Sequence, residues 1–537
     1  MLIDARTLGA DAQIEADLCV VGAGPVGLTV ALELGRAGRR VCVLDAGGAT
    51  GTEPVPGEVE GEPYPPLGDA RRSGIAGTVA LWNAELAPGR WGARLVPLDP
   101  SDFDGWPFDG AALEPFHARA CELFGLGTFD PEPERWGVPV PLGEEVESAV
   151  YRFAPASVFA EDVRAELERS REVTCYVNAR VLQLEEEAGR ITRARVASAP
   201  GRELTVAAPA FVLALGGIEN ARLLLLSELA RDSPVGRFYM DHPTLRARLE
   251  LAPGASADAL ALLDLRRDGG RLALGHLRLT EELRRREGLL TSGFIVAPSQ
   301  ERAERTRAAV ATLAHGPRTG RALARALAGA DLVALAAARK ASARVPALRA
   351  GARVWPSLGL LNTLGLGPVS GWSRLPRTTR RFRVFDAYQV IEQPPESERR
   401  ITLGQERDEY GQPLARLHWF VTDREVESAQ RSQELLGQAL AAAGLGRLVT
   451  SAELAPDGDP RTLLHPTAHH HLGAARMADD PARGVVDADS RVHGLANLFA
   501  TGTSAFATGG FVNPTLTAVA LALRLADHLS DTLTSPS

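Results

Sequence analysis

Apolar residues dominate two short runs near the N-terminus, separated by a glycine-rich segment and a helical pattern. The runs ADLCVV at 16–21 and RVCVLD at 40–45 are typical of buried strands. Between them, a turn at 22–27 leads into a helix through Arg36, and Gly38 suits the end of that helix. This order predicts a strand–helix–strand unit, which begins a parallel sheet.

The pattern changes twice along the rest of the chain. Segment 173–217 alternates strand patterns with turns and predicts a meander that ends in a buried strand, followed by a helix. From 235 to 463, strands of period two surround an Arg/Ala-rich helical stretch, and after 464 glycine-rich segments lead to a final helix from Thr515. We therefore expect an α/β protein in which residues 1–234 and 464–537 form one domain. Residues 235–463 form an inserted α+β domain.

Composition and net charge limit the number of domains and the classes of binding partner that can be expected. The chain has 537 residues, 45% of them hydrophobic, so two or more domains with sizeable cores are expected. The net charge of −8 gives no indication of nucleic-acid binding. One stretch, from Arg302 to Arg353, holds eleven basic residues and two acidic ones. It is either a pair of helices with solvated basic faces or a docking patch for an acidic partner or an anionic membrane surface.

The cysteines and the N-terminus favour a cytoplasmic protein. Four cysteines occur without a CxxC pair, at positions 19, 42, 121 and 175, which predicts reduced thiols and no disulfide framework. The N-terminus lacks a basic segment followed by an apolar one, so no secretory signal is expected. No stretch approaches about 20 uncharged apolar residues, so no membrane span is expected either.

The segment VVGAGPVG carries the first functional signature. Gly22 allows a tight turn, Gly24 lets the backbone approach a pyrophosphate, and Gly27 lets the helix pack on the strand. Pro25 suits the first helical turn, and the N–H groups at the helix N-terminus can bind phosphate. Asp45, at the end of the second strand, can accept hydrogen bonds from ribose hydroxyls. Together these features predict a dinucleotide site for either FAD or NAD.

Three consecutive histidines, at positions 469–471, form the second signature. A metal site is one interpretation, but neighbouring side chains point in different directions and no HxxxH or CxxC partner lies nearby. A purely structural role is another. The third is a general base, since a neutral imidazole beside a flavin can accept a hydroxyl proton. Asn513 can hold a substrate oxygen, and Pro514 and Thr515 open a helix whose N-terminus can face the reduced ring.

The two ends of the chain resemble the glucose–methanol–choline (GMC) oxidoreductase family. The resemblance begins with the block from GAGPVG to Asp45 and continues, in order, through IENARLLLLS, GRFYMDHP, HLGAARM and VNPTLTAVALALRLADHL. It implies FAD as the cofactor and a Rossmann-like FAD-binding domain with an inserted substrate domain on an antiparallel sheet. A flavin-covering loop is expected at about 70–130. No metal is expected.

The resemblance also assigns roles to individual residues. The catalytic histidine is the one seven residues before Met477, which is His470, and its partner is Asn513. Asn at this position resembles the sugar-oxidising branch that includes pyranose oxidase. The cofactor-binding residues implied are Gly22, Ala23, Gly24, Pro25, Gly27, Asp45, Ala46, Gly77, Thr78, Val181, Ala214, Gly216, Gly502, Thr503, Pro514 and Thr515. The family often has Asp where Gly502 or Thr503 stands, so the sequence departs from the pattern there.

Together these features predict oxidation of CH–OH to C=O by hydride transfer to FAD. The substrate is expected to be a sugar, a glycoside or an aminoglycoside-like compound. Polar residues in RVFDAYQVIEQ, such as Asp386 and Gln389, are expected to face the pocket or the solvent. FAD is expected to be non-covalent, because Leu81 precedes Trp82 where some relatives have a flavin-bonding His.

Three other functions remain open. They are another class of FAD enzyme, a dehydrogenase subunit that passes electrons to a cytochrome or quinone, and a non-catalytic flavin-binding module. The expected partners are a small hydroxylated substrate and an electron acceptor, which is oxygen, a quinone or a redox protein. A homo-oligomer is possible.

Overall fold

The computed structural model describes most of the chain. The described residues are 1–9, 11–87, 90–127, 132–268, 271–299, 312, 319–320, 323–324, 372–374 and 382–533. The basic stretch from Arg302 to Arg353 therefore lies almost entirely outside the described residues, and its two interpretations stay open.

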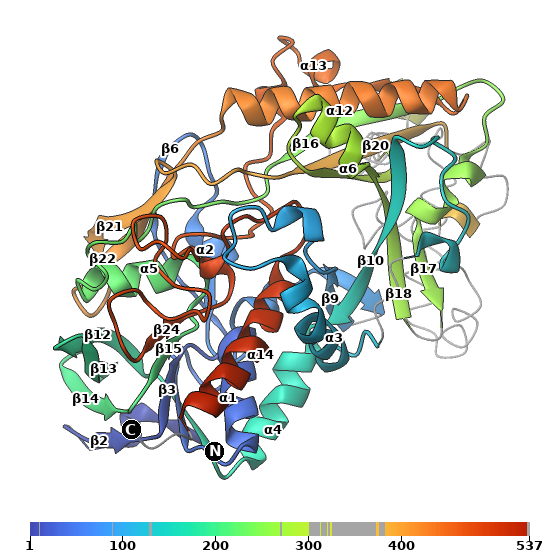
Figure 1. Ribbon diagram of the computed structural model, residues 1–537. Helices are drawn as coiled ribbons and strands as arrows, with labels where there is room; N and C mark the ends of the chain where they lie inside the picture. The colour runs from blue at the N-terminus through green and yellow to red at the C-terminus, as the bar shows by residue number, and fades with distance from the viewer. Residues whose placement is uncertain are drawn as a thin grey trace.

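A parallel sheet forms the centre of the part of the molecule that holds the N-terminus (Figure 1). Its strand order is β1-β11-β4-β3-β15-β24, and every neighbouring pair is parallel. The predicted strand–helix–strand unit is present as β3, helix α1 (Pro25–Arg36) and β4. The six strands of this sheet that the structure describes are β1 (Leu2–Asp4), β3 (Leu18–Val21), β4 (Val41–Leu44), β11 (Val173–Val177), β15 (Phe211–Leu213) and β24 (Leu498–Ala500).

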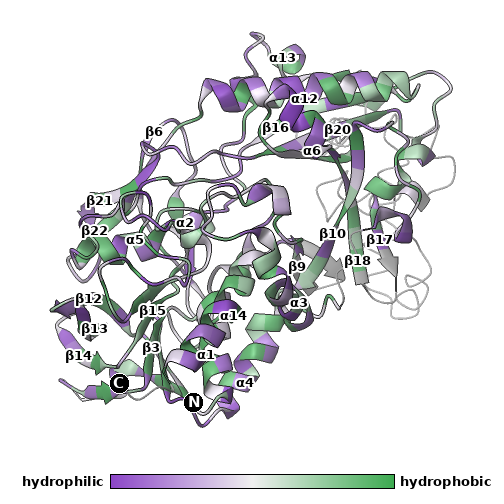
Figure 2. Cartoon of the chain, in the orientation of Figure 1, coloured by the Kyte–Doolittle hydropathy of each residue, from purple (hydrophilic) through white to green (hydrophobic). Residues whose placement is uncertain are grey.

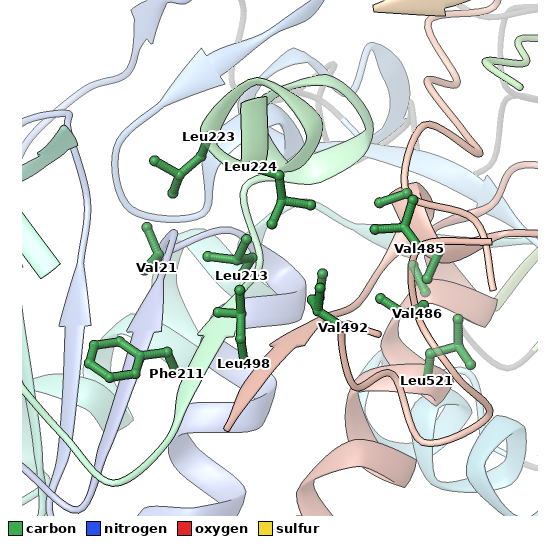
Figure 3. Packing of buried hydrophobic residues seen from close by; sticks show 14 of the residues in the cluster. Val21, Phe211, Leu213, Leu223, Leu224, Val485, Val486, Val492, Leu498 and Leu521 are labelled. Atoms are coloured by element: carbon green, nitrogen blue, oxygen red, sulfur yellow. The ribbon is translucent and has the colours of Figure 1, made fainter. Parts of the chain in front are cut away.

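The core of this region consists of aliphatic side chains from strands that are distant in sequence. Val21, Leu213 and Leu498 come from three adjacent strands and lie together, while Leu521 comes from the final helix α14 (Thr515–Thr532) (Figure 3). Each is at most 2% exposed. Complete burial of a Val or Leu side chain stabilises a fold by about 1.5–3 kcal/mol. This packing fixes the C-terminal ends of β3 and β15, which are each followed by a glycine-containing turn.

A large antiparallel sheet forms most of the other part of the molecule (Figure 1). Its order is β23-β16-β20-β19-β18-β10-β9-β8, with β17 paired to β18. The predicted α/β class with an antiparallel second sheet is confirmed. The division at 234/235 and 463/464 stays a prediction, and β8–β10 join this sheet from before residue 234. The described strands are β8 (Ala84–Ala87), β9 (Arg90–Leu95), β10 (Val146–Pro155), β16 (Thr244–Leu251), β17 (Leu265–Asp268), β18 (Arg271–Leu279), β19 (Ser292–Pro298), β20 (Val384–Ile391) and β23 (Gly446–Val449).

Helix α12 (Asp423–Ala442) packs on this sheet and was not expected from the hydrophobic pattern. Its N-terminus has a capping box, in which the Thr422 hydroxyl accepts from the Glu425 N–H and the Glu425 carboxylate accepts from the Thr422 N–H. Its apolar face contributes Leu435, Leu436 and Leu440 to the core of this part. Polar and apolar residues therefore alternate along the helix in Figure 2.

Smaller elements complete the fold. The predicted meander is present: β12 (Arg180–Glu187), β13 (Arg190–Ala199) and β14 (Arg202–Ala207) form a sheet with β2 (Gln13–Glu15). Strands β21 (Arg400–Arg407), β22 (Pro413–Trp419) and β6 (Glu58–Gly61) form another, and β5 (Glu53–Pro54) pairs with β7 (Arg72–Ser73). The remaining described α-helices are α2 (Leu67–Ala70), α3 (Glu114–Leu123), α4 (Arg164–Arg169), α5 (Gly216–Leu226), α6 (Glu281–Glu287) and α13 (Ser451–Leu454). All four cysteines are free and buried, as expected.

Candidate active site

One large cavity brings the two sequence signatures together. Its volume is about 980 Å³, and its lining includes Gly24 at one signature and both His470 and Asn513 at the other. All the predicted site residues line it except Ala23 and Gly27, which lie behind the glycine turn. Their assignment as cofactor-binding or catalytic residues stays a prediction. Residues from every chain segment that contains them line the cavity.

The glycines of the first signature are needed for steric reasons. A Cβ on Gly27 would lie 1.9 Å from the carbonyl oxygen of Gly22, so only glycine lets α1 approach the end of β3 this closely. A Cβ on Gly22 would lie 2.6 Å from the carbonyl oxygen of Ala214, and Gly22 has φ +110°. Gly24 differs, because no atom lies within 4 Å of its ideal Cβ. Its backbone faces open cavity, which leaves space for a ligand.

Asp45 holds the glycine-rich turns together. One carboxylate oxygen accepts from the N–H of Ala23 at 2.8 Å, and the other accepts from the N–H groups of Gly47 and Gly74 at 2.8 and 2.7 Å. Burial raises the pKa of Asp45, although these three hydrogen bonds oppose the shift. Asp45 also lines the cavity. The expected contact with a ribose therefore has to be made in addition to three backbone contacts that the sequence did not reveal.

Two helix N-termini open onto the same cavity. Helix α1 begins after Gly24 and helix α14 begins after Pro514, and no side chain caps either helix. The two helices pack against each other. Free N–H groups and the positive end of each helix dipole are suited to a phosphate or to an electron-rich ring edge. The open face of Gly24 and these two uncapped helices fit a dinucleotide cofactor such as FAD.

Asp241 organises the loop that carries the three histidines. It is completely buried, and one of its oxygens accepts from the backbone N–H groups of His242, Ala468 and His470 at 2.6, 3.2 and 3.0 Å. Its other oxygen accepts from the hydroxyl of Tyr64 at 2.6 Å and from that of Thr467. Burial raises the pKa of Asp241, but the neighbouring His471 and His470 and the hydrogen bonds from Thr467 and Tyr64 outweigh it and lower the pKa to about 2. A charged aspartate thus fixes the backbone of the histidine loop.

His470 lines the cavity and contacts a second histidine. Its Nδ1 lies 2.8 Å from Nδ1 of His242, so one of the two nitrogens donates to the other. Burial, together with the neighbouring His242, holds the pKa of His470 well below its usual range. Burial also lowers the pKa of His242 to about 4. Both rings are therefore neutral at neutral pH. If His470 donates through Nδ1, its Nε2 is left with a free lone pair.

The other two histidines occupy different surroundings. His471 is buried, and its Nδ1 lies 2.6 Å from the Tyr239 hydroxyl, on the side of the Asp241 network. Burial lowers the pKa of His471 to about 4. His469 is exposed at the edge of the cavity and has φ +63°. The described residues contain no cluster of His, Cys, Asp or Glu that could hold a metal ion.

The cavity wall near His470 comes from the antiparallel sheet. Arg94 of β9 and Phe153 of β10 are register partners, and both line the cavity. Asn513 also lines it, two residues after Phe511, whose ring contacts His276 at 5.8 Å between centroids. The same sheet contributes Leu265, Leu274 and Ile295 to the lining, so this part of the wall is apolar except for a few polar groups.

The polar residues of RVFDAYQVIEQ do not line the cavity, so the expected role for them in the pocket is wrong. Asp386 pairs with Arg246 at 3.0 Å. The Gln389 oxygen accepts from Gln433, and the Gln393 oxygen accepts from the Asp241 N–H. Both glutamines are at most 1% exposed, so they do not face the solvent either. Their polar groups serve internal networks instead.

Sequence reasoning missed the residues that hold His470 in place. Asp241 and His242 lie in the block GRFYMDHP, which was recognised only as part of the family pattern. An acid and a histidine side by side in such a block were a usable signal. Tyr64 and Arg94 had no such signal, because nothing in their local sequence places them beside the cavity. In the described part of the chain, no helix is both long and apolar enough to cross a membrane.

Comparisons with known proteins found similarity over part of the sequence and over most of the fold. Residues 395–522, which include His470 and Asn513, match the family model described as GMC oxidoreductase. A C-glycoside 3-oxidase from Microbacterium trichothecenolyticum is 35% identical over 135 residues, which cover 24% of this chain and 23% of that protein. A 6'''-hydroxyparomomycin C oxidase from Streptomyces lividus is 29% identical over 163 residues, covering 29% and 28%.

The matched segments thus span less than a third of these relatives' own length. The likeness to solved structures covers much more of the chain. A crystal structure of formate oxidase aligns with 98% of this chain and 99% of its own, with a TM-score of 0.55 and 16% identity. At this identity the likeness shows a common fold.

Proposed function

We propose that this chain, whose residues 395–522 match the GMC oxidoreductase family model and whose fold is shared with formate oxidase, binds FAD and oxidises an alcohol. The reaction is CH–OH to C=O on a hydroxyl-rich compound of the sugar or glycoside class. The observation that carries this proposal is the single cavity that connects the uncapped N-terminus of α1 with His470 and Asn513. The C-glycoside oxidase among the relatives supports the substrate class by analogy.

The glycine turn and the two helix N-termini would hold the cofactor. The N–H groups at the start of α1, beside Gly22 and Gly24, suit its diphosphate, and the start of α14 at Pro514 and Thr515 suits its ring system. Gly77, Thr78, Val181, Ala214, Gly216, Gly502 and Thr503 line the space between and beside these points. When bound, FAD supplies an acceptor for the hydride of the alcohol carbon.

His470 is the proposed general base. Its pKa is depressed, so the ring is neutral and able to accept the hydroxyl proton of the substrate. A proton on Nδ1, shared with His242, leaves Nε2 as the accepting atom. The charge of Asp241, whose carboxylate binds the His470 N–H, favours the protonated ring that results. Asn513 would donate its amide N–H to the substrate oxygen and orient the carbon that loses hydride.

The proposal is tested by anaerobic reduction of the bound flavin. Purified protein is loaded with FAD and mixed without oxygen with glucose, an aryl glucoside, an aminoglycoside, choline, a long-chain alcohol and benzyl alcohol. Loss of the visible flavin band with the sugar or glucoside supports the proposal. If only the long-chain or aromatic alcohol bleaches the flavin, the substrate class is wrong. If the protein binds NAD and no flavin, the cofactor is wrong too.

The flavin is proposed to be non-covalent. Leu81, which lines the cavity beside Trp82, has no nucleophile that could bond to it. Acid precipitation should therefore release all the flavin into the supernatant, whereas yellow colour that stays with the pellet contradicts this.

The electron acceptor, location and assembly are also proposals. Oxygen, a quinone and a redox protein are distinguished by reoxidation of the reduced enzyme with each acceptor. A cytoplasmic location is supported by four free, buried thiols. A homo-oligomer is tested by the concentration dependence of the sedimentation coefficient.

A further inference from the structure

Arg94 places a guanidinium group at the wall of the cavity. It lies on β9, its side chain is partly buried, and its Cζ lies 5.3 Å from the centroid of the Tyr151 ring. Its charge acts on both His276 and His470, since it contributes to the lowered pKa of each. Arg94 therefore lies at the His470 end of the cavity.

No carboxylate neutralises Arg94 among the described residues. Among the residues that the structure describes, the only group that raises the pKa of Arg94 is the Tyr151 hydroxyl, and burial lowers that pKa overall. Arg278 is also close to Tyr151 and His276, but it pairs with Asp99 at 2.8 Å and with Glu147 at 2.6 Å. A partly buried arginine without an acidic partner is costly to a fold, so a ligand that supplies the missing charge is the natural counterpart.

The wall around Arg94 is apolar. Phe153 stands opposite Arg94 on β10, and Leu274 and Leu265 are register partners on β18 and β17. All three line the cavity, as does Ile295 of β19. Two acids on the same sheet face are already paired, Glu147 of β10 with Arg278 and Asp386 of β20 with Arg246. This combination fits a molecule with an apolar or aromatic portion and one anionic group.

We propose that Arg94 binds a negatively charged group of the substrate, so that hydroxylated acids are oxidised in preference to neutral or cationic analogues. A carboxylate would accept two parallel N–H hydrogen bonds from the guanidinium. This inference rests on the proposed oxidation of an alcohol in the same cavity. It excludes aminoglycosides as good substrates, because their ammonium groups would approach an unneutralised cation in a poorly solvated pocket.

The cofactor's own charges do not need Arg94. The diphosphate has the N-terminus of α1 and the glycine turn, and the ring edge has the N-terminus of α14. No side chain caps either helix end, whereas Arg94 lies on β9 of the antiparallel sheet. The charge is therefore assigned to the substrate.

Calorimetric binding to the FAD-loaded protein tests the site without turnover. The probes are benzoate, its neutral isostere benzamide, and benzylamine. Benzoate should bind the wild type at least about 30-fold more tightly than it binds Arg94→Gln, because removal of one partner of a desolvated charge pair costs that much or more. Benzamide should change less than about 3-fold. Arg94→Lys should retain part of the benzoate affinity. Arg278→Gln, which removes a paired arginine, is the matched control and should behave like the wild type.

Several outcomes overturn the proposal. One is benzoate binding no more tightly than benzamide, and another is an equal loss for both probes in Arg94→Gln. If Arg94→Gln does not retain FAD, the comparison between Arg94→Lys and the wild type decides, and equal ratios of benzoate to benzamide affinity contradict the proposal.

Flavin reduction by phenyl β-glucuronide and phenyl β-glucoside separates this inference from the proposed function. If benzoate binding depends on Arg94 but neither glycoside reduces the flavin, the anion site is supported and sugar oxidation is contradicted. If the glucoside reduces the flavin but benzoate binding does not depend on Arg94, the oxidation is supported and the anion site is contradicted. Faster reduction by the glucuronide, lost in Arg94→Gln, supports both.

Discussion

The glycine turn and the histidine loop line the same cavity. The hydrogen bonds that hold them join residues at very different separations along the sequence. The turn is closed by the bond between Ala23 and Asp45, which are 22 residues apart. The histidine loop is held by bonds from Asp241 to His470, 229 residues away, and from Tyr64 to Asp241, 177 residues away. Residues of a site that is held by short-range contacts lie close together in the sequence and form a recognisable motif. Residues of a site that is held by long-range contacts are scattered along the chain, so no motif reveals them.

This difference predicts different kinds of failure. A side chain added at Gly22 or Gly27 meets backbone atoms that have no space to move, so cofactor binding and the stability of the fold should decrease together. A change behind the histidine loop moves a catalytic group while the cofactor site remains.

Gly27→Ala should have the largest effect. Its new Cβ would lie 1.9 Å from the Gly22 carbonyl oxygen, so the turn must shift. We expect loss of bound FAD and a decrease of at least about 1–3 kcal/mol in the free energy of unfolding. Gly24→Ala is the matched variant, because its backbone has φ −76° and its Cβ meets nothing within 4 Å. It should keep its stability and lose FAD affinity, since the methyl group enters the cavity. Equal stability losses in both variants would contradict this account.

Asp241→Asn should slow flavin reduction by about 100-fold, with little change in KM. The amide removes the charge that anchors the loop, and a displacement of about 1 Å at a catalytic group costs that much. The pKa read from the pH dependence of the reduction rate (the kinetic pKa) should also fall, because the negative charge of Asp241 raises the pKa of His470. The rate and its pH profile are measured by stopped-flow spectrophotometry.

Asp386→Asn provides the control for Asp241→Asn. Asp386 is also buried and charged, but it pairs with Arg246 and does not line the cavity. It should lose stability without the change in kinetic pKa. A similar shift of the pH profile in both variants would show that Asp241 has no positioning role.

The buried histidines should make the fold sensitive to acid. The folded pKa values of His242 and His471 are about 4, below the ordinary value of 6.5. Below pH 6.5 the unfolded chain therefore binds more protons than the folded one, and stability falls until pH 4. Between pH 7 and pH 5 the loss should be about 2 kcal/mol for each histidine. Guanidinium unfolding at the two pH values measures it, and His471→Asn should lose about 2 kcal/mol less than the wild type. An unchanged difference contradicts the assignment.

Arg94→Gln should give the smallest of these effects on the pH profile. The charge of Arg94 lowers the pKa of His470, so its removal raises that pKa. The acid limb of flavin reduction then moves to higher pH, because a larger share of His470 is protonated and inactive. Arg94→Lys keeps the charge and should keep the limb in place. A shift to lower pH, or an equal shift in the lysine variant, would show that Arg94 does not act on His470.

The same contrast in range explains what could be predicted from the sequence. The β3–α1–β4 unit and the start of α14 were predicted within a few residues, because hydrophobic periodicity and glycine spacing are local. Helix α12 was missed, although Thr422 and Glu425 spelled a capping box, because the polar face of the helix obscured its apolar stripe. Asp386 and Gln389 of β20 were misplaced, because strand alternation does not say what lies on each face, whereas Tyr388 faces the solvent, which was one of the two expected positions. Gln389 and Gln393 bond to partners from distant segments.

The rate of anaerobic flavin reduction in His470→Ala shows whether His470 is the general base. The account predicts a decrease of about 10²–10⁴-fold relative to the wild type, at unchanged FAD content, because a positioned base contributes that much. His469→Asn is the matched control, since His469 is the adjacent histidine, is exposed, and has φ +63°, which Asn tolerates. Its loss should be much smaller. Equal losses in the two variants, or a wild-type rate in His470→Ala, would contradict the claim that His470 is the base.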